Sequence, residues 1–252
     1  MAGSPEIGTA DYVIVGAGSA GCVLANRLSA SGKHDVALLE YGGSDIGPFI
    51  QMPAALSYPM NMKRYDWGYR SQPEPHIGGR RLATPRGKVL GGSSSINGLV
   101  YIRGNARDFD AWEAQGATGW SGRHVAPYFR RLENVEGADP AIRGTEGPLH
   151  ITVPEQQHPL DQAFMNAAQE AGFNRTEDCN GLHQEGFGPM DQTIWKGRRW
   201  SAANAYLKPA RGRENLKVYH GLACRVLWKG DKAIGVELVR KGERRVLMAR
   251  RE

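Results

Sequence analysis

Short apolar runs and glycine-rich turns alternate over the first part of the chain. Residues 11–15 and 35–40 are β-branched and aliphatic runs of the kind found in buried parallel strands. Between them, apolar residues recur at helical spacing up to Ser31-Gly32. A strand, a glycine-rich turn, a helix and a second strand within about 30 residues predict a βαβ unit, whose right-handed crossover makes the two strands parallel.

The later segments change between helical and strand patterns. Residues 42–84 are rich in glycine, proline and aromatic residues and predict an ordered excursion. Residues 106–135 predict a pair of helices, residues 147–153 a strand that leaves the first domain, and residues 160–172 a further helix. Alternation of apolar and polar residues near the C-terminus predicts a small antiparallel meander. Its four strands are expected at residues 216–219, 225–228, 233–238 and 245–248, with turns at 230–231 and 241–242.

The composition fits a globular chain with a core, since 40% of its 252 residues are hydrophobic and 8% are aromatic. Its 33 glycines are an excess that nucleotide-binding turns would explain. A net charge of +6 is compatible with a nucleic-acid or membrane partner. Much of the excess of positive charge, however, lies near the C-terminus, at Arg240, Lys241, Arg244, Arg245, Arg250 and Arg251. Because no aromatic residues interleave with them, we interpret these residues as a solvated strand face and expect no nucleic-acid partner.

Cysteine usage and the N-terminal segment bear on the compartment. Cys22, Cys179 and Cys224 are an odd set without CxxC spacing, so neither a disulfide framework nor a metal site is predicted. Residues 1–10 are expected to be a disordered leader. They have neither the basic nor the apolar region of a signal peptide, so no signal peptide is predicted. No apolar run of about 18 residues or more occurs. These patterns favour a cytoplasmic protein and give no prediction about membrane association.

A glycine fingerprint follows the first strand. Gly16, Gly18 and Gly21 have the GxGxxG spacing, and Glu40 ends the second strand about 20 residues further on. Gly16 would make the tight turn, Gly18 would let a pyrophosphate approach the backbone, and Gly21 would let the helix pack closely on the strand. The helix N-terminus would face the phosphates, and Glu40 would accept hydrogen bonds from an adenosine ribose. The pattern predicts a dinucleotide site but does not separate FAD from NAD.

A second motif, residues 85–104, contains Gly91-Gly92, three serines at 93–95 and Asn97. Glycines let the backbone approach a flat polar ligand, and the hydroxyl and amide groups supply hydrogen bonds. A Gly/Ser run is also typical of a flexible loop, but apolar residues on both sides of this one favour a packed segment. The motif resembles the first signature of the glucose–methanol–choline (GMC) flavin oxidoreductases.

The resemblance to GMC enzymes covers nearly all of residues 11–252 and is greatest to the choline dehydrogenase branch and to bacterial alcohol dehydrogenases of the family. Supporting strings occur at residues 51–56, 63–67, 185–191 and 197–203. The resemblance implies FAD as the cofactor. Besides Gly16, Gly18, Gly21 and Glu40, the residues implied to contact it are Ser19 and Ala20 at the pyrophosphate, Val89, Gly92, Ser93, Asn97, Gly98, Leu99 and Val100 at the flavin, and Ala223 at the adenine.

Two positions depart from the family pattern. Tyr41 follows the acidic residue where family members usually have alanine, so its phenol would crowd the adenosine pocket or lie on its rim. Ile96 occupies the place at which some relatives, the choline oxidases among them, attach flavin covalently through a histidine. Because an alkyl side chain forms no such bond, we expect FAD to bind noncovalently.

The resemblance implies oxidation of a primary alcohol, choline or a similar one, to the aldehyde by hydride transfer to flavin N5 in the complete enzyme. Family members take up the hydroxyl proton with a histidine near the far C-terminus, and this chain ends at Glu252 before that region. We therefore predict no catalytic residue here. The seven histidines lack a partner at suitable spacing, and the serines at 93–95 lack the GxSxG setting of a nucleophile.

The expected partners are a small-molecule alcohol and a C-terminal half or partner chain. The chain would then be a fragment of a longer enzyme, one part of a split enzyme or a degraded paralogue. One alternative function is a noncatalytic or partner-dependent FAD-binding fragment. Another is an NAD-linked dehydrogenase, for which no nicotinamide half-site is found in the sequence.

The expected fold class is α/β. Residues 11–148 and 214–252 would form a Rossmann-like FAD-binding domain, with a parallel sheet and an antiparallel meander, that is incomplete at its C-terminus. Residues 149–213 would form the first part of an α+β substrate domain.

Overall fold

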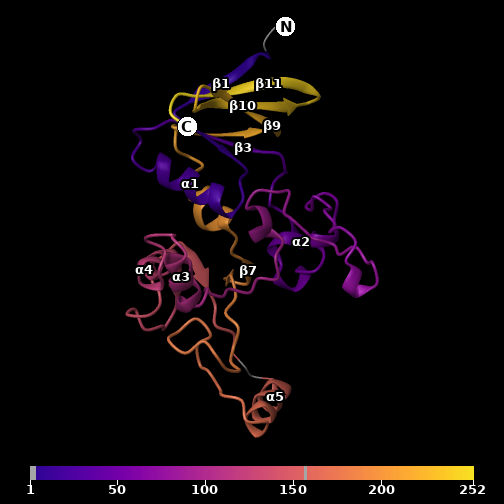
Figure 1. Ribbon diagram of the computed structural model, residues 1–252, viewed down its shortest axis with the longest axis vertical. Helices are drawn as coiled ribbons and strands as arrows, with labels where there is room; N and C mark the ends of the chain where they lie inside the picture. Colours follow the sequence, from indigo (N-terminus) through magenta and orange to yellow (C-terminus); the bar gives the residue numbers. More distant parts are fainter. Residues whose placement is uncertain (1–3, 156–157) are drawn as a thin grey trace. The chain divides into compact units, whose positions relative to one another are not determined.

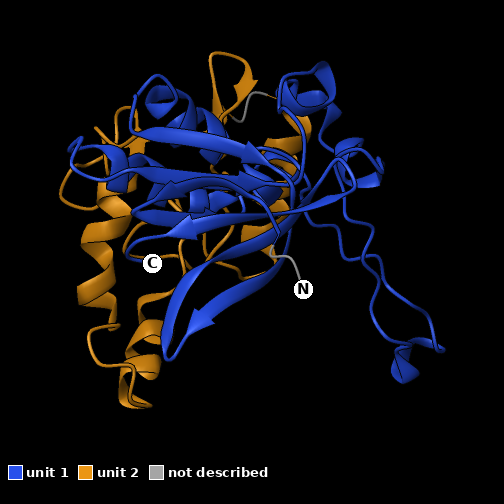
Figure 2. Cartoon of the chain, turned by 90° about the horizontal axis from the view of Figure 1, so that it is seen from above, with its two compact units in different colours: residues 1–98, 201–252 blue, residues 99–200 orange. Residues whose placement is uncertain are grey.

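The computed structural model describes residues 4–155 and 158–252, and the chain divides into two compact units. Unit 1 comprises Met1–Gly98 and Ser201–Glu252, and unit 2 comprises Leu99–Trp200 (Figure 2). Each unit has its own sheets and its own buried core. The chain therefore leaves unit 1 once and returns to it once.

The unit boundaries differ from the domain boundaries expected from the sequence. The expected changes lie at 148/149 and 213/214, whereas the units change at 98/99 and 200/201. Strand β4 (Glu133–Val135) pairs in parallel with β5 (Leu149–Ile151), so a cut after residue 148 would separate two hydrogen-bonded strands. The division into FAD-binding and substrate domains stays a prediction.

Unit 1 contains the βαβ unit expected from the sequence (Figure 1). Strand β2 (Tyr12–Val15) leads through a glycine-rich turn into helix α1 (Ser19–Ser29), and β3 (Val36–Glu40) runs parallel to β2. Every residue of β3 is buried, as expected of a central strand. Strand β8 (Leu216–His220) lies parallel to β3 on its other side, so the strand order is β2–β3–β8.

The antiparallel meander has three strands and not the four expected. Strands β9 (Leu222–Lys229), β10 (Lys232–Arg240) and β11 (Glu243–Ala249) follow one another in antiparallel order, with both turns at the predicted positions. The prediction is wrong for β8, which pairs with β3 in the parallel sheet. A short alternating run fits either kind of sheet, because side-chain alternation does not identify the neighbouring strand.

The disordered leader expected at residues 1–10 is wrong for its second half, where β1 (Glu6–Ala10) pairs in parallel with β11. This strand completes the sheet β1–β11–β10–β9. Ala10 joins a buried cluster that spans both sheets and comprises Ala10, Ala37, Leu39, Val236, Leu238 and Leu247. The short sequence of β1, in which Ile7 is the one large apolar residue, does not predict a strand, because β1 is paired with a strand far along the chain.

Between β3 and the second motif, unit 1 makes the ordered excursion that the composition predicts. It contains short helical turns, which are α2 (Pro48–Gln51), η1 (Pro53–Ala55), η2 (Pro59–Asn61), η3 (Pro75–Ile77) and η4 (Gly92–Ser95). Residues 66–87 pair as an irregular two-stranded ladder, which projects in Figure 2 as a long blue arm with η3 at its tip. After the chain returns, η5 (Ala203–Leu207) and α6 (Lys208–Ala210) pack on α1.

Unit 2 contains the predicted helix pair, α3 (Ala106–Ala114) and α4 (Gly122–Leu132), and the predicted helix α5 (Pro159–Glu170). The Asn105 side chain accepts a hydrogen bond from the Arg107 amide (3.0 Å) and caps α3. A short antiparallel pair, β6 (Ile194–Trp195) and β7 (Arg198–Arg199), precedes the return to unit 1. The expected helices are therefore confirmed.

Candidate dinucleotide-binding site

The turn between β2 and α1 is built by glycines. Gly16 has a φ of +91°, and its amide donates a hydrogen bond to the Leu39 carbonyl of β3 (2.7 Å). A Cβ on Gly21 would lie 1.9 Å from the Gly16 carbonyl oxygen, so only glycine lets α1 pack this closely on the turn. α1 has no acidic residue in its first turn, so its free amides and positive dipole end stay available to an anion.

Glu40 ends β3 with its carboxylate fixed beside this turn. Its Oε2 accepts a hydrogen bond from the Ala17 amide and its Oε1 accepts one from the Gly42 amide, both at 2.7 Å. The residue is only 6% exposed. Since each carboxylate oxygen has two lone pairs, both oxygens keep a further acceptor position for ligand hydroxyl groups.

The second motif packs on the first one. The Gly91 amide donates to the Ala17 carbonyl (2.7 Å), so Ala17 is bonded both to Glu40 and to the second motif. Ser94 and Ser95 donate from their hydroxyls to the carbonyls of Gly91 (2.6 Å) and Leu90 (2.7 Å). These internal bonds show a packed segment and exclude the flexible-loop alternative.

A hollow of about 820 Å³ belongs to unit 2, whereas unit 1 contains one of about 630 Å³ at the two glycine motifs. The hollow in unit 1 is lined by seven residues that the sequence analysis assigned to the cofactor, namely Gly16, Gly18, Ser19, Glu40, Gly92, Ser93 and Ala223. Gly21 and Val89 are buried and do not line it. Strand ends and backbone turns from four parts of unit 1 therefore converge on a single cavity.

The other assigned residues do not line this hollow. Ala20 is exposed on α1, and Asn97 and Gly98 are exposed after η4. Leu99 and Val100 belong to unit 2, where Leu99 is buried and its carbonyl accepts a hydrogen bond from the Thr193 amide (2.8 Å). Their contacts with a cofactor stay predictions.

Sequence reasoning missed an aromatic wall of the hollow. Tyr41, Trp67 and Tyr69 line it, together with Arg86. Tyr41 stood out in the sequence as a departure from the family pattern, but nothing local shows that the aromatic residues of the excursion return to the end of β3. The remaining residues that the sequence analysis did not assign are Val15, Leu39, Gly87, Gly221 and Leu222.

Ile96 is not among the residues that line the hollow. It is 2% exposed and packs in a cluster with Ile50, Tyr65 and Val89. An alkyl side chain in such a cluster offers no atom for a covalent link to a ligand. The cluster instead supports the segment that leads into η4.

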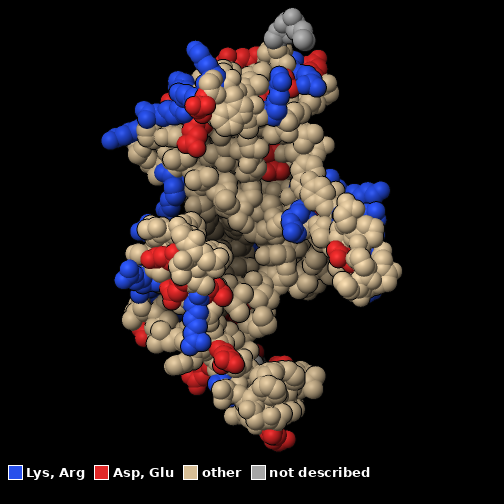
Figure 3. Space-filling view, viewed as in Figure 1, with Lys and Arg blue, Asp and Glu red and all other residues tan. Residues whose placement is uncertain are grey.

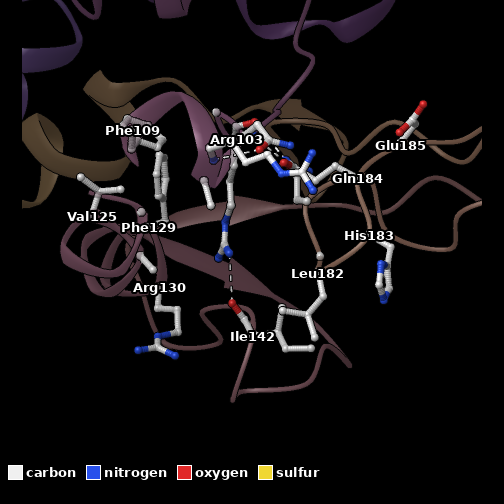
Figure 4. Close-up of a pocket in the computed structure, with 18 of the residues that line it drawn as sticks. Arg103, Phe109, Val125, Phe129, Arg130, Ile142, Leu182, His183, Gln184 and Glu185 are labelled. Carbon is white, nitrogen blue, oxygen red and sulfur yellow. Dashed lines mark hydrogen bonds between the residues drawn. The ribbon is translucent and has the colours of Figure 1, made fainter. Parts of the chain in front are cut away.

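The hollow in unit 2 is lined by cationic, amide and aromatic side chains (Figure 4). Arg103 extends into it, and its guanidinium donates to the Ile142 carbonyl (3.0 Å). The same guanidinium forms a double ion pair with Glu133 through Nε (2.6 Å) and Nη2 (2.5 Å). Arg103 is therefore engaged in holding the fold of unit 2.

A buried ion network lies behind that hollow. Arg143, whose side chain is 2% exposed, pairs with Glu133 (3.1 Å), Asp178 (2.7 Å) and Asp191 (2.7 Å). Burial opposes ionisation of Glu133, but hydrogen bonds from Arg103, Tyr101 and the Gly144 amide outweigh it and lower the pKa of this carboxyl. Burial likewise disfavours the charged form of Arg143, yet its carboxylate partners raise its pKa. The network joins three segments of unit 2.

The histidines with clear contacts have structural roles. The imidazole of His150 stacks on Trp195 with ring centroids 4.3 Å apart, and burial lowers the pKa of His150. His158 accepts a hydrogen bond from the Leu160 amide (3.1 Å) and caps α5. Over residues 4–155 and 158–252, no group of three or more His, Cys, Asp or Glu side chains is placed to hold a metal ion.

The basic C-terminal residues lie among acidic ones. Arg244 pairs with Glu237, and Arg250 pairs with Asp11 (2.9 Å) and Asp35 (2.5 Å). Figure 3 shows basic and acidic residues interspersed over the upper part of the view, where the meander lies. In the part of the chain that the structure describes, no helix has the length and apolar character needed to cross a membrane.

Comparisons with known proteins match this architecture. Residues 10–252 match the family model described as GMC oxidoreductase. The chain is 58% identical over 243 residues to the oxygen-dependent choline dehydrogenases of Brucella anthropi and of Rhizobium johnstonii, covering 96% of this chain and 44% of each relative. It thus spans less than half the length of these curated relatives.

Two solved structures are similar over almost the whole chain. Pyridoxine 4-oxidase from Mesorbium loti has a TM-score of 0.90 and 35% identity, over 95% of this chain and 48% of that one. An FAD-dependent oxidoreductase from Chaetomium thermophilum has a TM-score of 0.88 and 28% identity, over 96% of this chain and 44% of that one. With a Rossmann-like unit 1, the two glycine motifs packed together and the family model matched over residues 10–252, the chain belongs to the GMC oxidoreductase family.

Proposed function

We propose that unit 1 binds FAD noncovalently in the hollow beside Gly16 and Glu40. The observation that carries this proposal is the buried Glu40 carboxylate, which the Ala17 and Gly42 amides hold at the hollow with acceptor positions to spare. Such a carboxylate suits the two hydroxyls of an adenosine ribose and repels a 2′-phosphate. The glycine backbone and the N-terminus of α1 suit the pyrophosphate.

Other residues fit the same cofactor. The solved Chaetomium thermophilum relative is an FAD-dependent oxidoreductase by name. Ser93 lines the same hollow next to Gly92, and we propose that it contacts the flavin. The buried alkyl group of Ile96 is the basis for proposing noncovalent binding.

We further propose that the protein to which this unit belongs oxidises a primary alcohol, choline or a similar one, to the aldehyde. Bound FAD would supply a hydride acceptor. The residues of this chain hold and orient the cofactor, and none is assigned as the base that takes the hydroxyl proton. The support is the 58% identity to oxygen-dependent choline dehydrogenases.

The cofactor is tested with an absorption spectrum of the purified 252-residue chain before and after FAD is added and the sample is desalted. We expect flavin bands that stay with the protein at a ratio near one per chain. A well-folded chain that loses all flavin on desalting and shows no FAD affinity in a titration would refute the self-sufficient site. FAD binding that occurs only after a second chain is added would favour the partner-dependent alternative.

The substrate is tested in a polypeptide that also carries a region equivalent to the rest of the choline dehydrogenases. We expect anaerobic choline to bleach its flavin absorbance. Bleaching by other primary alcohols but never by choline would refute the choline assignment and leave alcohol oxidation in place. Tight flavin binding without reduction by any alcohol would favour the noncatalytic alternative.

A further inference from the structure

Three aromatic rings form a stack along one wall of the hollow in unit 1. The ring centroids of Tyr41 and Trp67 are 5.2 Å apart with 20° between the planes, and those of Trp67 and Tyr69 are 6.1 Å apart with 2° between the planes. All three residues line the hollow. Rings at these separations attract one another, so the wall is flat and aromatic.

The middle ring of this stack has firm support. The Trp67 amide donates to the Arg86 carbonyl (3.0 Å), and the Lys88 ammonium lies 5.7 Å from the centroid of the indole. Lys88 is in turn bonded through its amide to the carbonyl of Tyr65 (2.7 Å), a residue that is 4% exposed. Trp67 is therefore a fixed surface against which Tyr41 packs.

The backbone on both sides of Tyr41 is also fixed. The Glu40 carbonyl accepts a hydrogen bond from the Gly221 amide (3.0 Å), and the Gly42 amide donates to the Glu40 carboxylate (2.7 Å). Gly42 lies so close to the next segment that a Cβ on it would be 2.2 Å from the Lys88 carbonyl carbon. The position of Tyr41 follows from these constraints.

Tyr41 itself nevertheless remains 49% exposed. One face of its ring stacks on Trp67, and the residue lines the hollow. Tyr41 directly follows Glu40, the proposed ribose anchor. A base attached to that ribose would thus meet a flat and open aromatic surface within its reach.

We infer that Tyr41 is the stacking platform for the adenine of FAD, so that the bound state has four layers: adenine, Tyr41, Trp67 and Tyr69. The inference rests on the proposed FAD site. It assigns a specificity role to a residue at a position where the family pattern usually has alanine. The platform favours ligands that carry adenine over flavins that lack it.

The test compares FAD, FMN and ADP in titrations of the flavin-free 252-residue chain. Tyr41→Ala removes base–aromatic stacking, and we expect this loss to weaken FAD and ADP binding by about tenfold or more. The affinity for FMN is expected to stay within about twofold of that of the unaltered chain. Tyr41→Phe, which keeps the ring, is expected to keep all three affinities within about threefold. Tyr41→Leu keeps most of the volume without the ring and is expected to follow Tyr41→Ala.

A matched control is Tyr58→Ala in the same unit. Tyr58 is 58% exposed and its ring lies 5.6 Å from that of Phe49, so it resembles Tyr41 in exposure and in aromatic contact, but it is not among the residues that line the hollow. Its loss is expected to leave all three affinities unchanged.

Several outcomes would overturn the platform. Unchanged FAD and ADP affinities in Tyr41→Ala and Tyr41→Leu would do so while leaving the FAD site intact. Equal losses for FAD and FMN would show that Tyr41 only supports the fold. If the unaltered chain bound neither FAD nor ADP, the proposed function and this inference would fail together.

Discussion

Gly92 lies directly on the backbone of Gly18, because a Cβ placed on Gly92 would be 2.7 Å from the Cα of Gly18. This approach brings the second glycine motif onto the first and shapes the side of the hollow assigned to the pyrophosphate. Gly92 also has a φ of +56°, a left-handed conformation that disfavours any residue with a Cβ. Two independent constraints therefore require glycine here.

We expect Gly92→Ala to lower the free energy of unfolding by about 1–3 kcal/mol and to weaken FAD binding. Urea denaturation and an FAD titration measure the two effects. Gly212→Ala is the control, since a Cβ there meets open space within the same unit, and its effect is expected within about 0.5 kcal/mol. Equal effects for the two variants would contradict the close approach.

We expect Glu40→Gln to lower both stability and FAD affinity. The glutamine amide has only one oxygen to accept from Ala17 and Gly42, so one buried amide would face an NH₂ group, at a cost of about 1–3 kcal/mol. The free energy of unfolding and the FAD dissociation constant measure this. Glu214→Gln, at an exposed position of unit 1, controls for the loss of one negative charge. An unaffected Glu40→Gln chain would show that Glu40 is not needed at the turn.

We expect Arg143→Met to destabilise unit 2 by about 3–5 kcal/mol, because Glu133 and Asp191 would keep their charges in a buried place without this partner. Arg245→Met removes the partly exposed pair with Glu243 and is expected to cost about 1 kcal/mol or less. Chemical denaturation of the unaltered chain and of the two variants measures their free energies of unfolding. Similar losses for both variants would mean that the buried network adds nothing beyond a surface pair.

Glu113 provides a prediction about pH. Its carboxylate accepts a hydrogen bond from the Ser121 amide (2.6 Å) and contacts His124 (3.1 Å). The Ser121 bonds foremost, and then His124, lower the pKa of Glu113 from 4.5 to about 2. Because the folded-state pKa is depressed, this contribution to stability is present above pH 4.5 and is lost as the pH falls towards 2.

We therefore expect the unaltered chain to exceed Glu113→Gln in stability near neutral pH, and the difference to shrink between pH 4.5 and 2. Denaturation curves at several pH values measure the difference, and an NMR titration of the Glu113 carboxyl measures its pKa directly. A constant difference over this range, or a pKa near 4.5, would contradict the prediction.

The candidate site shows how far local patterns reach. The spacing of Gly16, Gly21 and Glu40 predicts a tight turn, close helix packing and an acid at the strand end, and the structure has all three. These relations lie within a single βαβ unit, where neighbouring residues set the geometry. The apolar residues on both sides of the second motif likewise predict a packed segment, and in the structure it packs on the first motif, where the Gly91 amide donates to the Ala17 carbonyl.

Contacts between distant segments were not predictable in the same way. The alternation in β8 is compatible with the meander as well as with the parallel sheet, and only pairing with β3 decides between them. The short segment β1 becomes a strand because it pairs with β11. In both cases the strand is stabilised by pairing with its neighbour and not by the sequence of the segment itself.

By itself, the sequence determined the βαβ unit, the two glycine motifs, the helices of unit 2 and the membership of a flavin oxidoreductase family, because each is encoded in short-range spacing or in extended similarity. The tertiary structure alone decided the pairing of β8 and β1, the joining of residues 99–148 with residues 149–200, and the meeting of Tyr41 with Trp67. These features depend on which distant surfaces bury one another. Which distant segments become neighbours is a property of the folded chain as a whole, so no local pattern carries it.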